Sequence, residues 1–280
     1  MKKIKILLLI CLIFPVFIAG CTCNSSVYVV QREYENAEKY LVGNQTYSNV
    51  TNIDLEWLAG DITIIQSTED DKVIIKEDVS LNDKKRVHSY FKDGTLLIKY
   101  WQSGLDGNIK SDMKNIVITI PVIDNLILHT SNGNIVSKDI KVNQSIDISQ
   151  LVGGVNIKSI DCPDIKVSAG NNKVNIEKIN ANNLKVTAYS DIKLNELNVN
   201  NSTIYSSRGN VDVTFVSAQQ AKVSTFSGNS TIKIPDEGAI IKSKGTFQSQ
   251  REYTVTDDGY IIGTGDMVLE LSSSGNNIIK

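Results

Sequence analysis

The chain has 280 residues, enough for one large or two small domains, and a formal net charge of −2. Removing the first 20 residues takes away three lysines and no acid, and the remaining 26 basic and 31 acidic side chains argue against nucleic-acid binding. Few aromatic residues, four prolines and abundant Val, Ile, Thr, Ser and Asn favour a strand-rich fold.

The N-terminus has the pattern of a secretory signal peptide. Three of the first five residues are lysines. The apolar run 6–18 is too short for a membrane-spanning helix, and it ends in small residues before Cys21. Residues 18–21 read Ile-Ala-Gly-Cys and resemble a bacterial lipobox. The resemblance implies diacylglyceryl transfer to the Cys21 thiol, cleavage before Cys21 and acylation of the new amine, so that several acyl chains anchor the protein stably. The alternative is an ordinary secretory signal with a coincidental cysteine.

These signals predict an extracytoplasmic lipoprotein. Residues 1–20 are expected to be removed, and the mature chain is expected to be anchored to a bacterial membrane, at the cell surface or facing the periplasm. Residues 21–48 are interpreted as the lipid anchor and a tether, with a short helix around 32–39. The folded domain is expected to occupy residues 49–280.

The cysteines and histidines do not indicate a metal site. Cys11 lies in the removed segment and Cys21 is the predicted lipid carrier, which leaves Cys23 and Cys162. These two are interpreted as unpaired thiols, although an extracytoplasmic disulfide between them is the alternative. The two histidines are far apart in the sequence, at His88 and His129.

Alternating apolar and polar residues predict strands in the first part of the folded domain. Residues 53–57 alternate, Gly60 and Asp61 turn the chain, and a second strand follows at 62–65. We interpret this part as the first, larger coils of the solenoid described next, and a separate small β-domain is the alternative. Further strands are expected at 73–76, 95–101 and 115–121.

The stretch from Leu126 to Gly245 repeats about every 19 residues. Each copy has one apolar residue, a second two places on and a third three places later. Most copies follow a Gly or Asn turn, and another alternating run precedes each turn. Such a fixed period is typical of a solenoid. Clear copies begin at Val155, Val174, Ile192 and Val211, and weaker ones at Ile135 and Ile232.

The repeat predicts an all-β chain folded as a single β-solenoid of roughly 19-residue coils. Stacking gives each strand a neighbour on both sides, and alternation sends apolar residues inward. The period is too short for propeller blades. A right-handed coil is expected, because crossovers between parallel strands are nearly always right-handed. The alternative fold is an antiparallel β-sandwich.

The pattern loosens after Gly245 and then returns. Residues 253–255 and 260–262 flank Asp257-Asp258-Gly259, which predicts a hairpin. A strand is expected at 266–271, and Gly275-Asn276 repeats the central Gly–Asn turn.

Three parts of the sequence resemble a bacterial family of unknown function labelled "putative adhesin". They are the run from Ile53 through Gly60-Asp61-Ile62, the central Gly–Asn repeats, and the stretch from Gly265-Asp266 to Gly275-Asn276. The resemblance covers roughly residues 49–280 and implies an extracytoplasmic or membrane-associated β-solenoid. The family has no agreed catalytic residues, so the resemblance assigns none.

Candidate catalytic residues are scattered. A β-helix enzyme acting on polysaccharide needs carboxylates and a basic residue that converge on one outer face. The outward acids do not recur at one position of the repeat, and lysines are interspersed among them, so we interpret them as a solvated face. The acids are Asp147, Asp161, Asp164, Asp191 and Asp212, with Arg208 near the last.

Other possible sites lack the required pattern. Three serines have no nearby histidine and no nucleophile elbow. Two acidic runs lack calcium-loop spacing, and one Gly-x-Gly lacks a following helix. No cofactor and no metal site are therefore predicted. These residues are Ser224, Ser227 and Ser230; Glu69-Asp70-Asp71 and Asp257-Asp258; and Gly263 with Gly265.

The sequence predicts a non-enzymatic, lipid-anchored envelope protein. A rigid solenoid would present polar side chains for binding, adhesion or scaffolding. Its expected partners are the membrane, through acyl chains on Cys21, and an unidentified envelope protein or glycan. A role related to envelope stress is a variant. The alternative is a carbohydrate-active β-helix enzyme.

Overall fold

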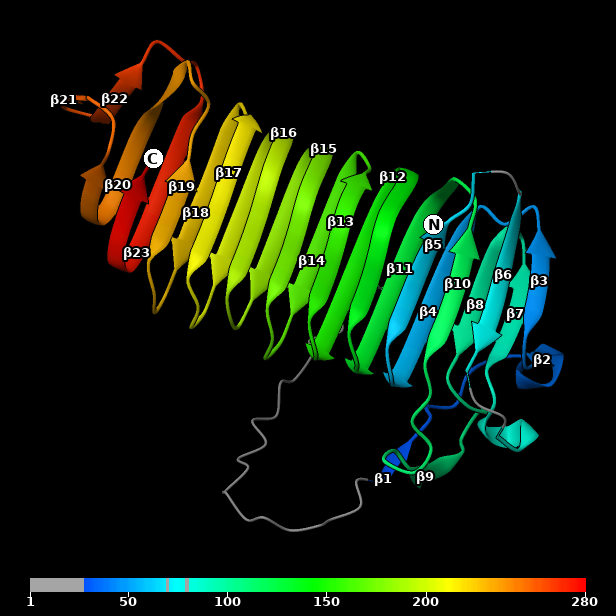
Figure 1. Ribbon diagram of the computed structural model, residues 1–280. Helices are drawn as coiled ribbons and strands as arrows, with labels where there is room; N and C mark the ends of the chain where they lie inside the picture. Colours follow the sequence, from blue (N-terminus) through cyan, green and yellow to red (C-terminus); the bar gives the residue numbers. More distant parts are fainter. Residues whose placement is uncertain (1–27, 69–70, 79–80) are drawn as a thin grey trace, which may run out of the picture.

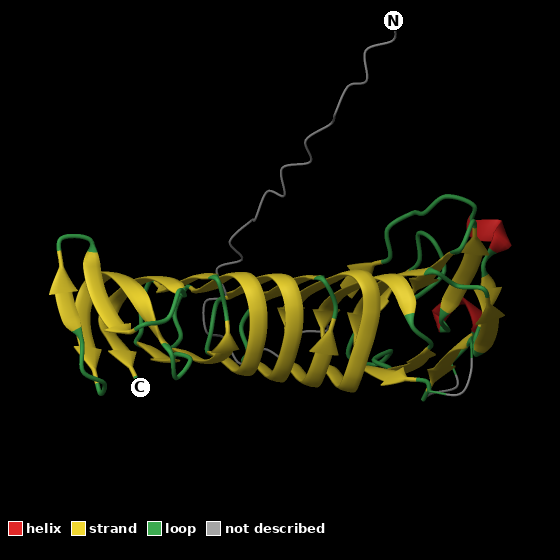
Figure 2. Ribbon diagram, turned by 90° about the horizontal axis from the view of Figure 1, so that it is seen from above, coloured by secondary structure: helices red, strands yellow, loops and turns green. Residues whose placement is uncertain are grey.

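The computed structural model describes residues 28–68, 71–78 and 81–280. Within these ranges, one sheet of 21 strands winds into a flattened rod (Figure 1; Figure 2). The central strands pair in parallel, coil upon coil, so the predicted all-β solenoid is confirmed and the antiparallel sandwich is wrong. The predicted signal peptide and the anchoring Cys21 lie outside the described residues.

Each central coil has two faces. The first face contains β14 and β18, and the second contains β13 and β17. The turn edge is where first-face strands end and Gly–Asn turns follow; at the opposite edge β12, β15 and β16 run on from the second face to the first. The central strands are β11 (Ile123–Asn132), β12 (Ile135–Val152), β13 (Val155–Asp161), β14 (Asp164–Ala169), β15 (Val174–Ala188), β16 (Ile192–Ser206), β17 (Val211–Ser217), β18 (Gln220–Thr225) and β19 (Ser230–Lys233).

The predicted repeat defines the register of the coils. The first two apolar positions of the four clear copies align residue for residue and face the core. The third position aligns in the first three copies, but in the fourth the register shifts, so that Phe215 is buried opposite Leu197 and the predicted Val216 is exposed. Burying a Val or Ile side chain contributes about 1.5–3 kcal/mol, so each coil gains most of its stability from its neighbours. The aligned first positions are Val155, Val174, Ile192 and Val211.

The N-terminal coils do not stack in chain order. The coil of β4 and β5 lies between the strands β8 and β10 on one side and β11 and β12 on the other. Beyond it, β6 pairs antiparallel with β10, and β7 with β8, so this end closes with reversed strands. The elements are β1 (Tyr28–Val30), η1 (Ala37–Lys39), β2 (Leu41–Val42), β3 (Gln45–Ser48), β4 (Asn52–Ala59), β5 (Ile62–Gln66), β6 (Lys72–Glu77), η2 (Asp83–Lys85), β7 (His88–Lys92), β8 (Thr95–Lys99), β9 (Asp106–Asn108) and β10 (Ile116–Ile120).

The folded structure begins before the expected boundary at residue 49. Strand β1 pairs with β9, β2 with β7 and β3 with β6, so the chain from Tyr28 onward belongs to the fold. Tyr40 is buried, and its ring lies 4.5 Å from that of Tyr34. These aromatic contacts anchor part of the segment 21–48, which was expected to be a tether, in the fold. The short helix is only a 3-10 turn, η1.

The C-terminal end also departs from chain order. The last strand, β23 (Val268–Ile279), lies between β18 and β19 on one side and β20 (Gly238–Ser249) on the other. The predicted hairpin is confirmed, because β21 (Thr254–Thr256) and β22 (Gly259–Gly263) pair antiparallel. The rings of Phe247 and Tyr260 stack 4.0 Å apart at this end.

Asparagine and aspartate side chains stabilise the turn edge. The Asp191 carboxylate accepts a hydrogen bond from the backbone N–H of Asn210, and Asn210 Oδ1 accepts one from Asn229 N–H, both at 2.9 Å. Asn229 Oδ1 in turn accepts one from Asn276 N–H at 2.8 Å. The turn asparagines therefore link one coil to the next.

We expect Asn210→Ala to lower the free energy of unfolding by about 1 kcal/mol, because one inter-coil hydrogen bond is lost. Asn171→Ala is the matched control, since the Asn171 side chain, also at the turn edge, makes no hydrogen bond within the described structure. Urea denaturation of both variants measures the difference. Equal stability of the two would show that the hydrogen-bonded ladder does not stabilise the stack.

A buried lysine joins the N-terminal coils. Lys114 Nζ donates hydrogen bonds to Glu77 Oε2 at 3.1 Å and to the carbonyl oxygens of Lys85 and Tyr100 at 2.6 and 2.7 Å. Its ammonium also lies 5.1 Å from the centre of the Trp57 ring and 4.8 Å from that of Tyr100. Burial lowers the pKa of Lys114 to about 8, although the Glu77 charge opposes this shift. The lysine is therefore charged at neutral pH and fully partnered.

A candidate binding groove on the first face

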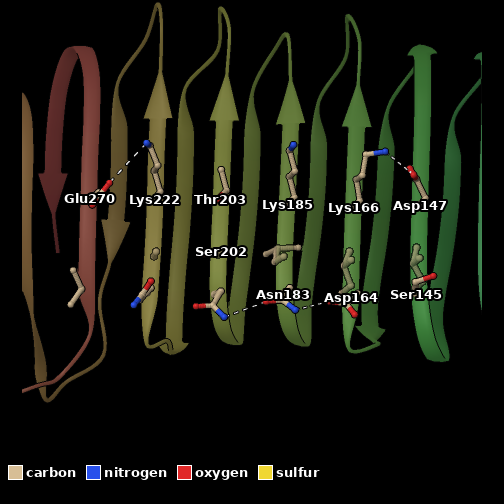
Figure 3. A pocket seen from close by; sticks show the side chains of 17 residues that line it. Ser145, Asp147, Asp164, Lys166, Asn183, Lys185, Ser202, Thr203, Lys222 and Glu270 are labelled. Atoms are coloured by element: carbon tan, nitrogen blue, oxygen red, sulfur yellow. Dashed lines mark hydrogen bonds and ion pairs between the residues drawn. The ribbon is translucent and has the colours of Figure 1, made fainter. Parts of the chain in front are cut away.

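Two rows of outward side chains run along the first face. Because strand residues two apart point to the same side, each strand contributes one side chain to each row, except β23, which has the apolar Val268 at the amide position. A groove of about 640 Å³ lies along them (Figure 3). The lysine row is Asp147, Lys166, Lys185, Thr203, Lys222 and Glu270; the amide row is Ser145, Asp164, Asn183, Asn201 and Gln220.

The amide row is held by hydrogen bonds between coils. Asn183 Nδ2 donates to Asp164 Oδ1 at 2.6 Å, and Asn201 Nδ2 donates to Asn183 Oδ1 at 3.2 Å (Figure 3). Each bond fixes which end of the amide faces its neighbour. The row is therefore a preorganised line of polar groups rather than a set of freely rotating side chains.

The lysine row carries weakly paired charges. Lys166 Nζ lies 2.7 Å from Asp147 Oδ2, and Lys222 Nζ lies 4.0 Å from Glu270 Oε2. Both pairs are solvent-exposed, and such pairs contribute only about 0–1 kcal/mol. Lys185, between them, forms no ion pair within the described structure. These ammonium groups can turn toward a ligand at little energetic cost.

The groove continues to the C-terminal end. A second stretch of about 910 Å³ is lined by Lys222 and Glu270 as well, so the two stretches are continuous. Its floor includes Tyr205 and Ser224, and the β21–β22 hairpin supplies a wall that includes Val255. The far end therefore has a wall that the lysine row lacks, and it also carries charged side chains, among them Lys242 and Asp257.

The candidate acids do not converge. Only two of them line the groove, and Arg208 lies over the Tyr189 ring, 5.1 Å from its centre. The acids are distributed over the whole solenoid: Asp147 and Asp164 in the groove, Asp161 at the opposite edge near Lys141, Asp191 at the turn edge, and Asp212 exposed on the second face.

The other candidates are also dispersed. Ser230 is buried and donates to Asn277 Oδ1 at 2.6 Å, whereas Ser227 is exposed in a turn. His88 is buried and bonded to the Arg86 carbonyl, whereas His129 is exposed on the first face.

The remaining polar candidates form turns. Asp257 and Asp258 form the β21–β22 turn, where they line the second stretch of the groove. Gly263 and Gly265 pack against the backbone around Gly238. Glu69 and Asp70 lie outside the described residues.

The described residues offer no metal site and no reactive thiol. No group of three or more His, Cys, Asp or Glu side chains in these ranges could hold a metal ion. Cys162 is a free, buried thiol whose pKa burial raises to about 11, so it is inert at neutral pH. Cys11 and Cys23 lie outside these ranges. The helices within them are single 3-10 turns, none of which has the length and apolar character needed to span a bilayer.

Sequence reasoning missed the groove itself. The lysines at 166, 185 and 222 recur at multiples of the coil length, which is the signal that could have revealed the row. The hairpin wall has no such signal, because it depends on β23 entering the sheet beside β18.

Several solved structures are similar over most of their length. A protein described as a "putative adhesin" from Bacteroides fragilis NCTC 9343 has 17% identity and a TM-score of 0.43, with 86% of this chain and 97% of that chain covered. A "putative lipid binding protein" from Parabacteroides distasonis ATCC 8503 has 15% identity and a TM-score of 0.49, with 85% and 97% covered. A "putative adhesin" from Parabacteroides merdae ATCC 43184 has 12% identity and a TM-score of 0.44, with 86% and 96% covered.

These likenesses are too distant to support a functional argument. No curated protein matches the chain. The sequence profile of the family described as Toastrack DUF4097 matches residues 50–249, which include the strands β14 to β18 and all residues of the two rows except Glu270. The chain therefore belongs to the Toastrack DUF4097 family.

Proposed function

We propose that this protein is a lipid-anchored, extracytoplasmic binding protein that holds an elongated envelope polymer, a glycan or an extended protein segment, along the first face. The observation that carries the proposal is the continuous groove with its two parallel rows of polar side chains. The carboxylates of the two rows favour binding over catalysis, because each already has its own partner: Asp147 pairs with Lys166, Asp164 accepts a hydrogen bond from Asn183, and Glu270 lies beside Lys222. Adhesion or scaffolding at the cell envelope would follow from such binding.

The groove geometry supports an elongated partner. It runs across strands spaced about 4.8 Å apart, and the same side-chain positions recur at every step. A polymer with repeated polar groups can meet the amide row and the lysine row many times over. Many weak contacts along a preformed surface add up to useful affinity because little ordering is required on the protein side.

Binding is tested with a fluorescent panel of envelope polysaccharides and with pull-down of envelope proteins by the mature chain. Lys185→Glu reverses a charge at the centre of the groove, and we expect it to weaken binding about tenfold. Lys193→Glu makes the same change on the second face and should leave binding unaltered. Equal loss in both variants would contradict the groove as the binding site.

The same polysaccharides test the enzymatic alternative. If the mature chain releases shorter products from any of them, the non-enzymatic proposal is wrong. Anchoring is tested separately by labelling cells with radioactive palmitate. We expect label in the wild type and none in Cys21→Ala, and equal labelling of the two would contradict the lipid anchor.

A further inference from the structure

Large apolar side chains are exposed along the turn edge. Leu151 is 65% exposed, Tyr189 41% and Phe226 74%, and each immediately follows the inward residues of its first-face strand. Met113, 54% exposed, precedes β10 at the same edge, where Asn115 bonds to the neighbouring turn residue Asp61. Four large apolar side chains, two of them aromatic, are thus exposed along one edge, where they can contact an apolar partner together.

The central members of this line are in register. Ser207 lies between Tyr189 and Phe226, and Gly170 lies between Leu151 and Tyr189, so a large residue recurs at every second coil. Two coils span about 9.6 Å, which places the three side chains along roughly 19 Å of one straight edge. We call Met113, Leu151, Tyr189 and Phe226 the apolar line.

The start of the folded chain lies at the same edge. The loop 100–114 joins the end of β8 to the start of β10, and its strand β9 pairs with β1. Figure 1 shows β1 and β9 projecting from the long edge at which β4 ends. Six residues separate Cys21 from Tyr28, and seven extended steps reach at most about 25 Å.

We propose that the turn edge lies on the lipid surface to which Cys21 is acylated, with the apolar line inserted at the boundary of headgroups and acyl chains. The proposal rests on the lipid anchor of the proposed function. The short reach of the chain brings this edge, rather than the opposite one, to the membrane. Tyrosine and phenylalanine at such a boundary are favourable, since their rings are amphipathic or apolar.

The charges at this edge suit a lipid surface. Lys110, Lys173 and Arg208 are exposed there and can meet anionic headgroups. Two carboxylates at the edge are engaged within the protein: Asp61 accepts a hydrogen bond from Asn134 N–H and Asp191 accepts one from Asn210 N–H. Asp106 on β9 is exposed, so the basic residues outnumber the free acids named at this edge. With the turn edge on the membrane, the first face points away from the lipid surface to one side of the rod. Its groove therefore remains accessible from solvent.

The opposite edge provides a matched comparison. It also exposes apolar residues, Ile65, Val122 and Val216, but the chain does not start there. Within the described ranges, the exposed large apolar residues of that edge are all aliphatic. Apolar exposure alone therefore does not select between the edges, and the experiment must compare them directly.

The test places a fluorophore on either edge of one coil. Ser227→Cys, beside Phe226, and Ser217→Cys, at the opposite edge, are both exposed positions and are labelled with an environment-sensitive dye in a Cys23→Ser background. The acylated full chain is reconstituted into vesicles of phosphatidylcholine and phosphatidylglycerol containing doxyl-labelled lipid. We expect quenching at 227 to exceed that at 217 by about threefold or more. Equal quenching, or none at 227, would overturn the proposal.

A second measurement separates this proposal from the anchor. Vesicle binding of the non-acylated Cys21→Ser chain should fall about tenfold on adding Leu151→Glu and Phe226→Glu, since two apolar contacts are lost. The pair Val122→Glu and Val216→Glu should leave it unchanged. If palmitate labelling fails, the anchor is wrong whatever these variants do. If labelling succeeds and both pairs behave alike, the membrane-facing edge is wrong and the anchor stands.

Discussion

Replacing Lys114 with methionine is expected to lower the free energy of unfolding by about 3 kcal/mol, because Glu77 then remains buried without one of its two cations. The Glu77 side chain is 1% exposed, and its other cationic partner is Arg86, whose Nε lies 2.9 Å from Oε1. Because Arg86 still pairs with Glu77 in this variant, the loss of unfolding free energy should lie at the lower end of the range for a broken buried ion pair. Urea denaturation measures it.

The double variant Lys114→Met with Glu77→Gln separates charge from packing. Removing both charges should recover part of the loss, because no unpaired ion is left behind. If the double variant is instead as unstable as the sum of both single changes, the ion pair is not the source of the effect.

The pH dependence of stability should change with Lys114. Its pKa of about 8 in the folded chain lies below its ordinary value of 10.5, so between these values the unfolded chain binds the proton more strongly. Stability should therefore rise as pH increases from about 8 toward 10. Burial raises the pKa of Tyr100, which reverses the trend at higher pH, where unfolded tyrosines ionise. Lys114→Met should lack the rise.

Gly153→Ala is expected to destabilise the central coils by about 3 kcal/mol or more. The φ angle of Gly153 is 137°, a region that costs an L-residue about 1–3 kcal/mol. A Cβ there would also overlap the carbonyl oxygen of Gly133 in the neighbouring coil. The stack cannot move apart locally without breaking the parallel pairing of β11 and β12. Thermal unfolding followed by circular dichroism measures the loss.

The neighbouring glycine is a control in the same turn. Gly154 has no positive φ, and the nearest atom to a Cβ at that position is the Lys173 carbonyl oxygen at 3.2 Å. Gly154→Ala should therefore cost less than about 1 kcal/mol. A similar loss in both variants would mean that turn flexibility, and not the backbone conformation of Gly153, limits stability.

The central coils were predictable because most copies obey the same local rule. Positions such as Val155 and Val174 must be apolar to face the core, and the turn between copies favours Gly or Asn, so the period is visible in one sequence. The end coils were not predictable in this way. Alternation predicts the strands β4 and β23 but not which strands pair with them. An inward-facing apolar residue can pack against the inward-facing residues of any coil beside it.

The extent of the folded chain was predicted less well than its repeat. Residues 28–48 have mixed charge and no period, which is typical of a tether, yet Tyr40 packs into the core and β3 completes the second face. Contacts with residues 24 to 80 positions away order this segment, and a local pattern cannot show them. The same holds for the groove: the spacing of its lysines was visible in the sequence, whereas the position of the predicted hairpin at the end of the groove was not.

The 19-residue coil makes the length of this protein adjustable in whole units. Inserting or removing one coil between two turns, for example residues 171–189, would keep every remaining side chain in its row and change the rod by one strand spacing of about 4.8 Å. Both ends are closed by separate antiparallel elements, so neither needs redesign. Duplication or loss of a coil therefore changes the length of the solenoid in steps of one strand spacing and preserves the side-chain rows on its faces.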